Sequence, residues 1–295
     1  MTAFAMVFSR LCRVGVSLVS VLSLSFGLLG CVNLKAVRDF SGSSLSGIKS
    51  FEQLGYTFED HCVDRCAYEA IRKFEFNRVL DCDCGLYLEA DSVMVSMYQV
   101  VGGYFEALGH LAQNELTEFS TEGLVTSLTA EELGPLTVDA NMAGAYSSIS
   151  NLMLRSTTDF YRRRKIAAYI EEANAPLQVL LEAFQKTTRE NLKGELRFKK
   201  ERLYAYYMDM KMNNTLQSDY EKGKAATDYY QTLGEIEKKE KQMELFADAL
   251  LEIAKGHQEL YDKRDKLVAK DLALAMLGYS GQVKILLSEF NKLKP

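Results

Sequence analysis

The chain has 295 residues, of which 47% are hydrophobic and 25% are charged, and its formal net charge is −5. Nucleic-acid binding requires a basic face, so this balance excludes it as the expected function, and we predict no nucleic-acid partner. Three prolines and no tryptophan, in a chain rich in Ala, Leu, Glu, Lys and Met, predict an all-α fold.

The N-terminal segment has the layout of a secretory signal, with Arg10 and Arg13 before a short apolar run at residues 14–29. An uncleaved transmembrane anchor is the alternative, but about 20 apolar residues are needed to cross a bilayer, and serines dilute this run. The run ends in Leu28-Leu29-Gly30-Cys31, which resembles the lipobox of bacterial lipoproteins. In that family the chain is cut before the cysteine, and lipid is attached to the cysteine sulfur.

The lipobox resemblance implies a cellular location for the protein and a division of the chain into three segments. We expect residues 1–30 to be a lipoprotein signal peptide, residues 31–48 to be a lipidated tether, and residues 49–295 to be a single helical-bundle domain. Cys31 would carry the acyl chains, palmitate among them, because a stable anchor needs more than one chain. Val32 stands where an Asp would retain such a protein at the inner membrane. The resemblance therefore implies a bacterial cell-envelope protein at the outer membrane, facing either the periplasm or the cell surface.

Two helices are expected in the first half of the body. The first begins near residues 46–50 and runs towards residue 79. The second covers residues 86–115, where apolar residues recur at steps of three and four. It contains Gly102 and Gly103, a pair that costs helix propensity, so either the helix kinks there or another backbone packs close to it.

Four cysteines remain beyond the signal and the lipidation site: Cys62, Cys66, Cys82 and Cys84. An even number in an exported chain predicts two disulfides, for which three pairings are possible. An antiparallel return of the chain favours nested pairing, in which an inner bond from Cys66 to Cys82 lies within a bond between the other two. A four-cysteine metal site helped by His61 is the alternative. It is disfavoured because the Cys82-x-Cys84 spacing is too short for a structural zinc site, so we expect no metal.

A connector and two helices are expected in the middle of the chain. Residues 117–136 predict a connector with one short helix, because Thr129-Ala-Glu-Glu132 resembles a capping box. A helical pattern then begins at Thr137. Pro176 is expected to break or kink it, with a new helix beginning near Asn174.

The last third predicts a turn and two long helices. Asn213-Asn214-Thr215 is typical of a turn, and the capping box Ser218-Asp-Tyr-Glu221 begins the next helix. The final helix has an apolar stripe over residues 272–293. Such spacing is typical of long helices packed antiparallel. The whole pattern predicts an elongated bundle of about five or six helices with a disulfide-bonded N-terminal hairpin.

Three stretches of the body, at residues 104–112, 169–178 and 253–261, resemble a family of uncharacterised bacterial lipoproteins. The resemblance implies an envelope address and a helical fold, and it implies no catalytic residues.

His257 is the first candidate site residue, because it lies on the apolar stripe of its helix one turn before Tyr261. A pocket between helices near these two residues, Gly102 and Gly103 would bind a small molecule or a lipid. The alternative is a core histidine bonded to a neighbouring helix. No nucleophile or glycine-rich motif accompanies His257, so we expect no catalytic residues, no cofactor and no enzyme.

The tyrosines of the second half are the other candidate site. Tyr206 and Tyr207 are adjacent, as are Tyr229 and Tyr230, so the four rings cannot all face one core. They predict a surface for a protein partner or for self-association, with packing at the edge of the core as the alternative.

The function that these patterns favour is a lipid-anchored cell-envelope protein that acts as a non-enzymatic helical protein-interaction module. Two alternatives are kept. One is a periplasmic small-molecule or lipid binder with an interhelical pocket near His257. The other is an envelope immunity lipoprotein that neutralises a toxin.

Overall fold

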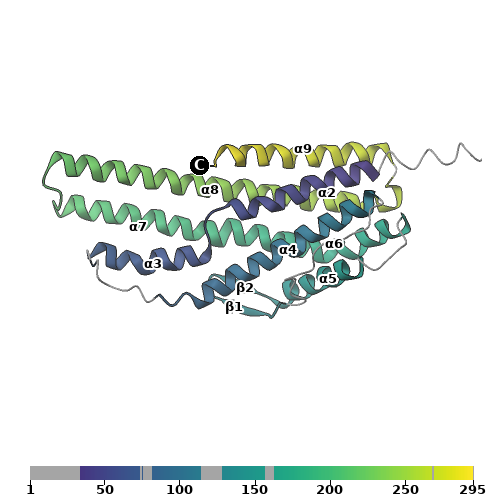
Figure 1. Cartoon of the computed structure of the whole chain (residues 1–295), viewed down its shortest axis with the longest axis horizontal. Helices are drawn as coiled ribbons and strands as arrows, with labels where there is room; N and C mark the ends of the chain where they lie inside the picture. The colour runs from purple at the N-terminus through teal and green to yellow at the C-terminus, as the bar shows by residue number, and fades with distance from the viewer. Residues whose placement is uncertain are drawn as a thin grey trace, which may run out of the picture.

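The computed structural model describes residues 34–73, 75, 82–113, 128–156, 163–267 and 269–294. The predicted signal peptide and Cys31 lie outside these residues. The all-α prediction is confirmed, because the described part contains eight α-helices and one small β-hairpin. The molecule is elongated, with its long helices roughly parallel to the long axis (Figure 1).

The helices are α2 (Leu34–Lys49), α3 (Phe58–Arg72), α4 (Gly85–Gln113), α5 (Ala140–Ser156), α6 (Arg163–Lys186), α7 (Lys193–Met212), α8 (Asp219–Asp262) and α9 (Lys270–Lys292). Short 3₁₀ segments, Ser50–Gln53 and Arg264–Lys266, follow α2 and α8. A π-helical segment, Thr187–Leu192, joins α6 to α7. One core cluster contains buried residues from α2 through α9.

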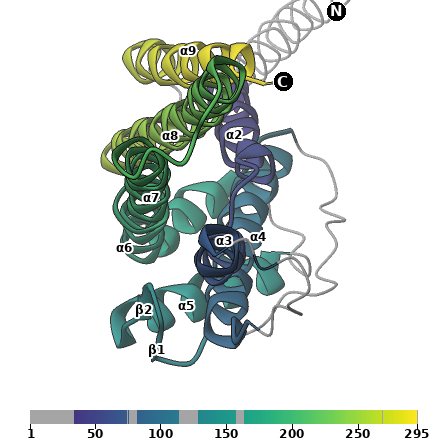
Figure 2. The same cartoon turned by 90° about the vertical axis from the view of Figure 1, so that its left-hand side faces the viewer.

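The prediction of a tether is wrong from residue 34 onward, where α2 begins. Val37, Phe40 and Ile48 of this helix are fully buried, and the helix lies beside α4, α8 and α9 (Figure 2). Serine and glycine are typical of linkers, but here they allow neighbouring helices to approach. A Cβ atom on Gly47 would lie 3.1 Å from side chains of α8 and α9. The packed body therefore begins at residue 34 and not at residue 49.

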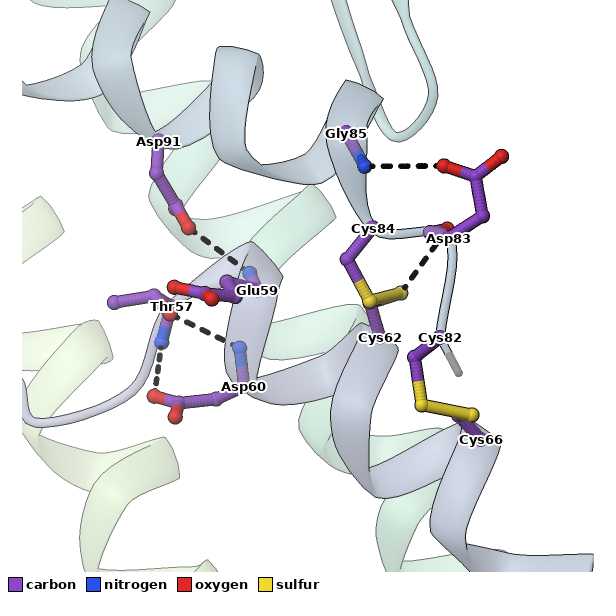
Figure 3. The surroundings of a disulfide bond; sticks show 10 residues. All are labelled: Thr57, Glu59, Asp60, Cys62, Cys66, Cys82, Asp83, Cys84, Gly85 and Asp91. Carbon is purple, nitrogen blue, oxygen red and sulfur yellow. Dashed lines mark hydrogen bonds between the residues drawn. A yellow bond between two sulfur atoms is a disulfide. The ribbon is translucent and has the colours of Figure 1, made fainter. Parts of the chain in front are cut away.

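The helix predicted from residues 46–50 towards residue 79 is wrong in its start, because the chain turns between α2 and α3, which begins at Phe58; residues 76–79 lie outside the described residues. Gly55 has a φ of 61° in this turn. Thr57 then caps α3 by accepting a hydrogen bond from the backbone N–H of Asp60, whose carboxylate accepts from Thr57 in return. Asp91 of α4 accepts from two further N–H groups of the first turn, each at 2.9 Å (Figure 3). This carboxylate fixes the start of α3 against α4.

The nested disulfide pairing is confirmed. Cys62 is bonded to Cys84 and Cys66 to Cys82, with Cα atoms 5.8 Å and 5.9 Å apart (Figure 3). The two bonds join one face of α3 to the non-helical residues that precede α4. The four sulfurs are therefore held in disulfides and are not available as thiolate ligands.

Two predictions for the middle of the chain are wrong. The expected short helix is a β-hairpin, in which β1 (Glu131–Leu133) pairs antiparallel with β2 (Leu136–Val138). Gly134 takes a φ of 61° at its turn, a left-handed conformation that glycine adopts without steric cost. Pro176 lies inside α6, whose neighbouring residues Ala173 and Leu177 are fully buried. Packing of this face against α8 offsets the backbone hydrogen bond that proline cannot make.

The α7–α8 hairpin extends beyond the core. Its turn and its capping box at Ser218 are confirmed, and Asn214 has a φ of 51° in the turn. The 44 residues of α8 extend for about 66 Å. No residue between positions 197 and 235 is buried, so the apolar side chains of this stretch of the hairpin, which we call the arm, are half-buried or exposed.

Candidate functional site

His257 lies at the centre of a buried hydrogen-bond network that joins three helices. Its Nε2 atom lies 2.6 Å from the hydroxyl of Tyr104 on α4, and its Nδ1 atom lies 2.9 Å from Oδ1 of Asn174 on α6. The side chains of His257 and Tyr104 are fully buried. The ring of Tyr169 stacks on Tyr104 with centroids 5.2 Å apart. The interpretation of His257 as a core residue bonded to neighbouring helices fits this arrangement.

The amide of Asn174 determines which ring nitrogen carries the proton. Its Nδ2 group donates to Gln258 at 3.0 Å, so its Oδ1 atom faces His257 and accepts a hydrogen bond from Nδ1–H. Nε2 then accepts from the Tyr104 hydroxyl. Burial lowers the pKa of His257 to about 3, so the imidazole is neutral at physiological pH. Both nitrogens are used, which leaves none free to act as a base on a ligand.

The other residues of the predicted pocket fill space between helices. A Cβ on Gly102 would touch α2 side chains at 3.6 Å and 3.7 Å, and one on Gly103 would overlap Met153 of α5. The pair therefore makes room for side chains of α2 and α5, whereas the prediction was a kink or a close backbone. Tyr261 lies under the guanidinium of Arg264, whose carbon is 4.3 Å from the ring centroid. These residues pack against neighbouring side chains.

The candidate interface tyrosines come together across the arm. Tyr206 contacts Tyr207, Tyr207 contacts Tyr229 and Tyr229 contacts Tyr230, with centroids 5.1 to 5.5 Å apart and rings edge to face. The row runs from α7 to α8. Partial burial raises the pKa of Tyr206 and Tyr207, so both stay neutral phenols at pH 7. Tyr230, at the end of the row, is 69% exposed.

A cavity of about 660 Å³ lies between the two helices near the tip of the arm. Its walls combine aromatic rings, methionines and small residues with two lysines, and they contain no carboxylate. The lining residues are Tyr204, Tyr207, Met208, Met210, Lys211, Asn214, Leu216, Lys222, Ala225, Ala226, Tyr229 and Tyr230. Aromatic and methionine side chains of this kind are enriched at protein interfaces.

The base of the arm is held by polar contacts from the disulfide-bonded helix α3. His61 is buried, and its Nε2 atom lies 2.9 Å from the carboxylate of Glu195 on α7. One turn further along α3, Asp64 pairs with Lys199 at 2.6 Å. From the sequence, His61 was considered only as a helper in the disfavoured metal site. The pairing was not foreseen because nothing in the local sequence shows which helix lies opposite α3.

A second cavity, of about 500 Å³, lies between α2, α4 and α9. It is lined by side chains of both charge signs, including Arg38, Glu106 and Lys284.

Among the described helices, none combines the length and the apolar character needed to cross a bilayer. Within the same residues, no three His, Cys, Asp or Glu side chains gather as a metal site.

Comparison of the chain with protein-family models, with curated proteins and with solved structures finds no match. The resemblance to uncharacterised bacterial lipoproteins therefore stays a prediction from the lipobox and the three short stretches of the body.

Proposed function

We propose that the chain is a lipid-anchored cell-envelope protein whose arm binds another protein chain. The observation that carries the proposal is the arm itself. It is a helical hairpin with no buried residue from position 197 to position 235, and it ends in a tyrosine- and methionine-lined cavity. A hairpin of two helices cannot bury its apolar side chains by itself, so a further chain would supply the missing contacts.

The chemistry of the arm supports binding over catalysis. The titratable side chains that line its cavity are phenols and lysines, and no carboxylate lies among them. Tyrosine offers a large apolar ring with a polar hydroxyl and loses little conformational entropy on binding, so it is favoured at interaction hot spots. The histidine that first indicated a ligand site is instead committed to the core.

The position of α2 supports a role for the anchor in presenting the arm. Only residues 32 and 33 separate Cys31 from the first residue of α2, so this connection spans at most about 10 Å. α2 begins at the end of the long axis opposite the tip of the arm (Figure 1). Lipid on Cys31 would hold that end against the bilayer and direct the arm away from it.

Photocross-linking in cells tests the binding role. A photoreactive phenylalanine analogue would replace Tyr230 in the full chain, expressed in a Gram-negative host, and a matched variant would carry it at Leu274 of α9, which is 61% exposed. We expect protein adducts from position 230 and few from position 274. Absence of protein adducts at position 230, or equal adducts at both positions, would contradict the proposal.

A further inference from the structure

We propose that the arm binds an amphipathic helix of a different protein, with the apolar face of that helix in the cavity and an acidic side chain beside Lys211 and Lys222. The inference rests on the proposed function, because it names the kind of partner that the arm takes. The occupied arm would be a bundle of three helices, in which the partner helix covers one side of the hairpin.

The cavity has the length of about two turns of a helix. On α8 its lining residues extend from Lys222 to Tyr230, eight positions that cover about 12 Å. Apolar side chains at positions i, i+4 and i+7 of a partner helix cover about 10 Å, so two turns of that helix match the cavity. At this end of the molecule α7 and α8 extend past the other described helices, so none of these lies beside the tip of the hairpin (Figure 1).

The walls of the cavity favour an apolar face. Nine of its twelve lining residues are Tyr, Met, Leu or Ala, a set that suits a row of large apolar side chains because methionine adapts to their shapes. Tyr204 and Tyr230 are among the nine, and they are 55% and 69% exposed. A helix is about 10–12 Å wide with its side chains, so it can cover both rings and the cavity, whereas a single acyl chain is thinner.

The backbone of the arm favours a helical partner over an extended one. The N–H and C=O groups of α7 and α8 bond within each helix, so they offer few hydrogen-bond partners to the backbone of an extended segment. Burying such a segment would leave its own polar groups unpaired, at a cost in free energy. A helix satisfies its backbone internally, so it avoids this cost.

The charges in the cavity indicate an acidic residue in the partner. Lys211 and Lys222 are the charged residues of its lining. Of the residues that the structure describes, none forms an ion pair with Lys211, and Lys222 lies 3.7 Å from Asp219, whose side chain is fully exposed. An exposed pair of this kind contributes little, so both ammonium groups are available to a carboxylate of the partner.

The same lysines argue against a second copy in the cavity. Under the proposed function, copies anchored in one bilayer have their tips at the same height. Contact of one cavity with the other would then place the lysines of the two copies together, and like charges at an interface repel. We therefore assign the helix to a different protein.

The sequence of the cross-linked peptide tests the kind of partner. The full chain with the photoreactive phenylalanine analogue at position 230 would be cross-linked in a Gram-negative host, and the adduct would be digested and sequenced by mass spectrometry. We expect a peptide of a different protein that has apolar residues at steps of three and four and an Asp or Glu within one turn of them. A peptide without this period, without an acidic residue, or from a second copy of this chain would overturn the inference.

A charge reversal tests the role of the lysines, with the same analogue at position 230 as the reporter. Lys211→Glu would place a like charge beside the acidic residue of the partner, so we expect the yield of protein adducts to fall about tenfold. Lys238→Glu is the matched control, because Lys238 is on α8 but outside the lining residues, about 24 Å from Lys222 along the helix. Its yield should equal that of the unmodified arm.

A second pair of variants tests entry into the cavity. Ala226 lines the cavity and is exposed, so Ala226→Gln would fill part of the space and should lower the yield of adducts about tenfold. Ala205 is an exposed alanine of α7 outside the lining, and Ala205→Gln should leave the yield unchanged. All four substituted side chains are exposed or half-buried, so the thermal unfolding midpoint of each variant should match that of its control. Loss of adducts could then not be attributed to misfolding.

Equal yields in either variant and its control would overturn the inference. If position 230 still cross-links to a protein in that case, the partner does not use the cavity, and the binding role of the arm stands. If position 230 of the unmodified arm cross-links to no protein, both the inference and the proposed function are overturned.

Discussion

His257 is neutral in the folded protein because its ring is buried and both of its nitrogens are bonded. Burial lowers its pKa to about 3, whereas an imidazole in the unfolded chain titrates near 6.5. Between these two values the unfolded state binds a proton that the folded state does not. The free energy of unfolding therefore falls as the pH falls from 6.5 towards 3, by up to about 1.4 kcal/mol per pH unit from this group.

Urea unfolding from pH 7 to pH 4 measures this effect. The His257→Gln variant lacks the titrating ring, so its free energy of unfolding should decline less steeply with falling pH than that of the unmodified chain. Both proteins contain all the other titrating groups. The difference between their slopes of unfolding free energy against pH therefore gives the contribution of His257. Parallel curves would contradict the assignment of a buried, neutral imidazole.

Gly256 is required for the packing of α2. A Cβ at this position of α8 would overlap the ring of Phe40, which is fully buried and has no room to move. Gly256→Ala should therefore lower the free energy of unfolding by about 1–3 kcal/mol. Gly278→Ala, at an open helical position, should raise it by about 0.5–1 kcal/mol. Thermal unfolding of the two variants checks both signs, and a stabilising effect at position 256 would show that α2 does not dock there.

At the scale of elements, α3 is positioned by disulfides and by polar contacts. The bond between Cys66 and Cys82 spans 16 positions of sequence, and its removal should cost about 3 kcal/mol of stability through the entropy of the unfolded chain. Urea unfolding of a Cys66→Ser, Cys82→Ser double variant would measure this cost. The bond from Cys62 to Cys84 stays intact in the variant, so it serves as the internal control. Unchanged stability would indicate that this bond does not constrain the hairpin.

The elements that the sequence predicted well are those with a long hydrophobic period or a local cap. α4, α9, the turn near Asn214 and the capping box at Ser218 are of this kind, because each depends on contacts within a few residues. α2 was missed because its serines and glycines resemble a linker when the helices that they contact are not known. A break or kink was predicted at Pro176, and the helix continues through it, because local rules do not include the packing of α6 on α8.

The candidate site was predictable only in part, for the same reason. The adjacency of two tyrosine pairs showed that some rings had to leave the core, and the structure places them in one row across the arm. The partners of His257 lie 83 and 153 positions away in sequence. The pairing of His61 with Glu195 also joins residues that are far apart in sequence. Such contacts depend on the packing of helices and leave no local pattern.

At the scale of the whole molecule, the proposed function combines a lipid at one end with a binding surface at the other. The short connection from Cys31 to α2 would keep the first turn of α2 close to the bilayer. The arm, along α8, would then extend its tip on the order of 60 Å from the anchored end. A chain without the lipid would lose this orientation, so the proposed function depends on lipidation of Cys31.

Mass spectrometry of the N-terminus tests that claim most directly. The full chain would be expressed in a Gram-negative host, extracted from membranes with detergent and digested. We expect the N-terminal peptide to begin at Cys31 and to carry a diacylglycerol, with or without a third acyl chain. A Cys31→Ser variant should lack both the cleavage and the lipid. A peptide that begins at Met1, with an unmodified thiol at position 31, would contradict it.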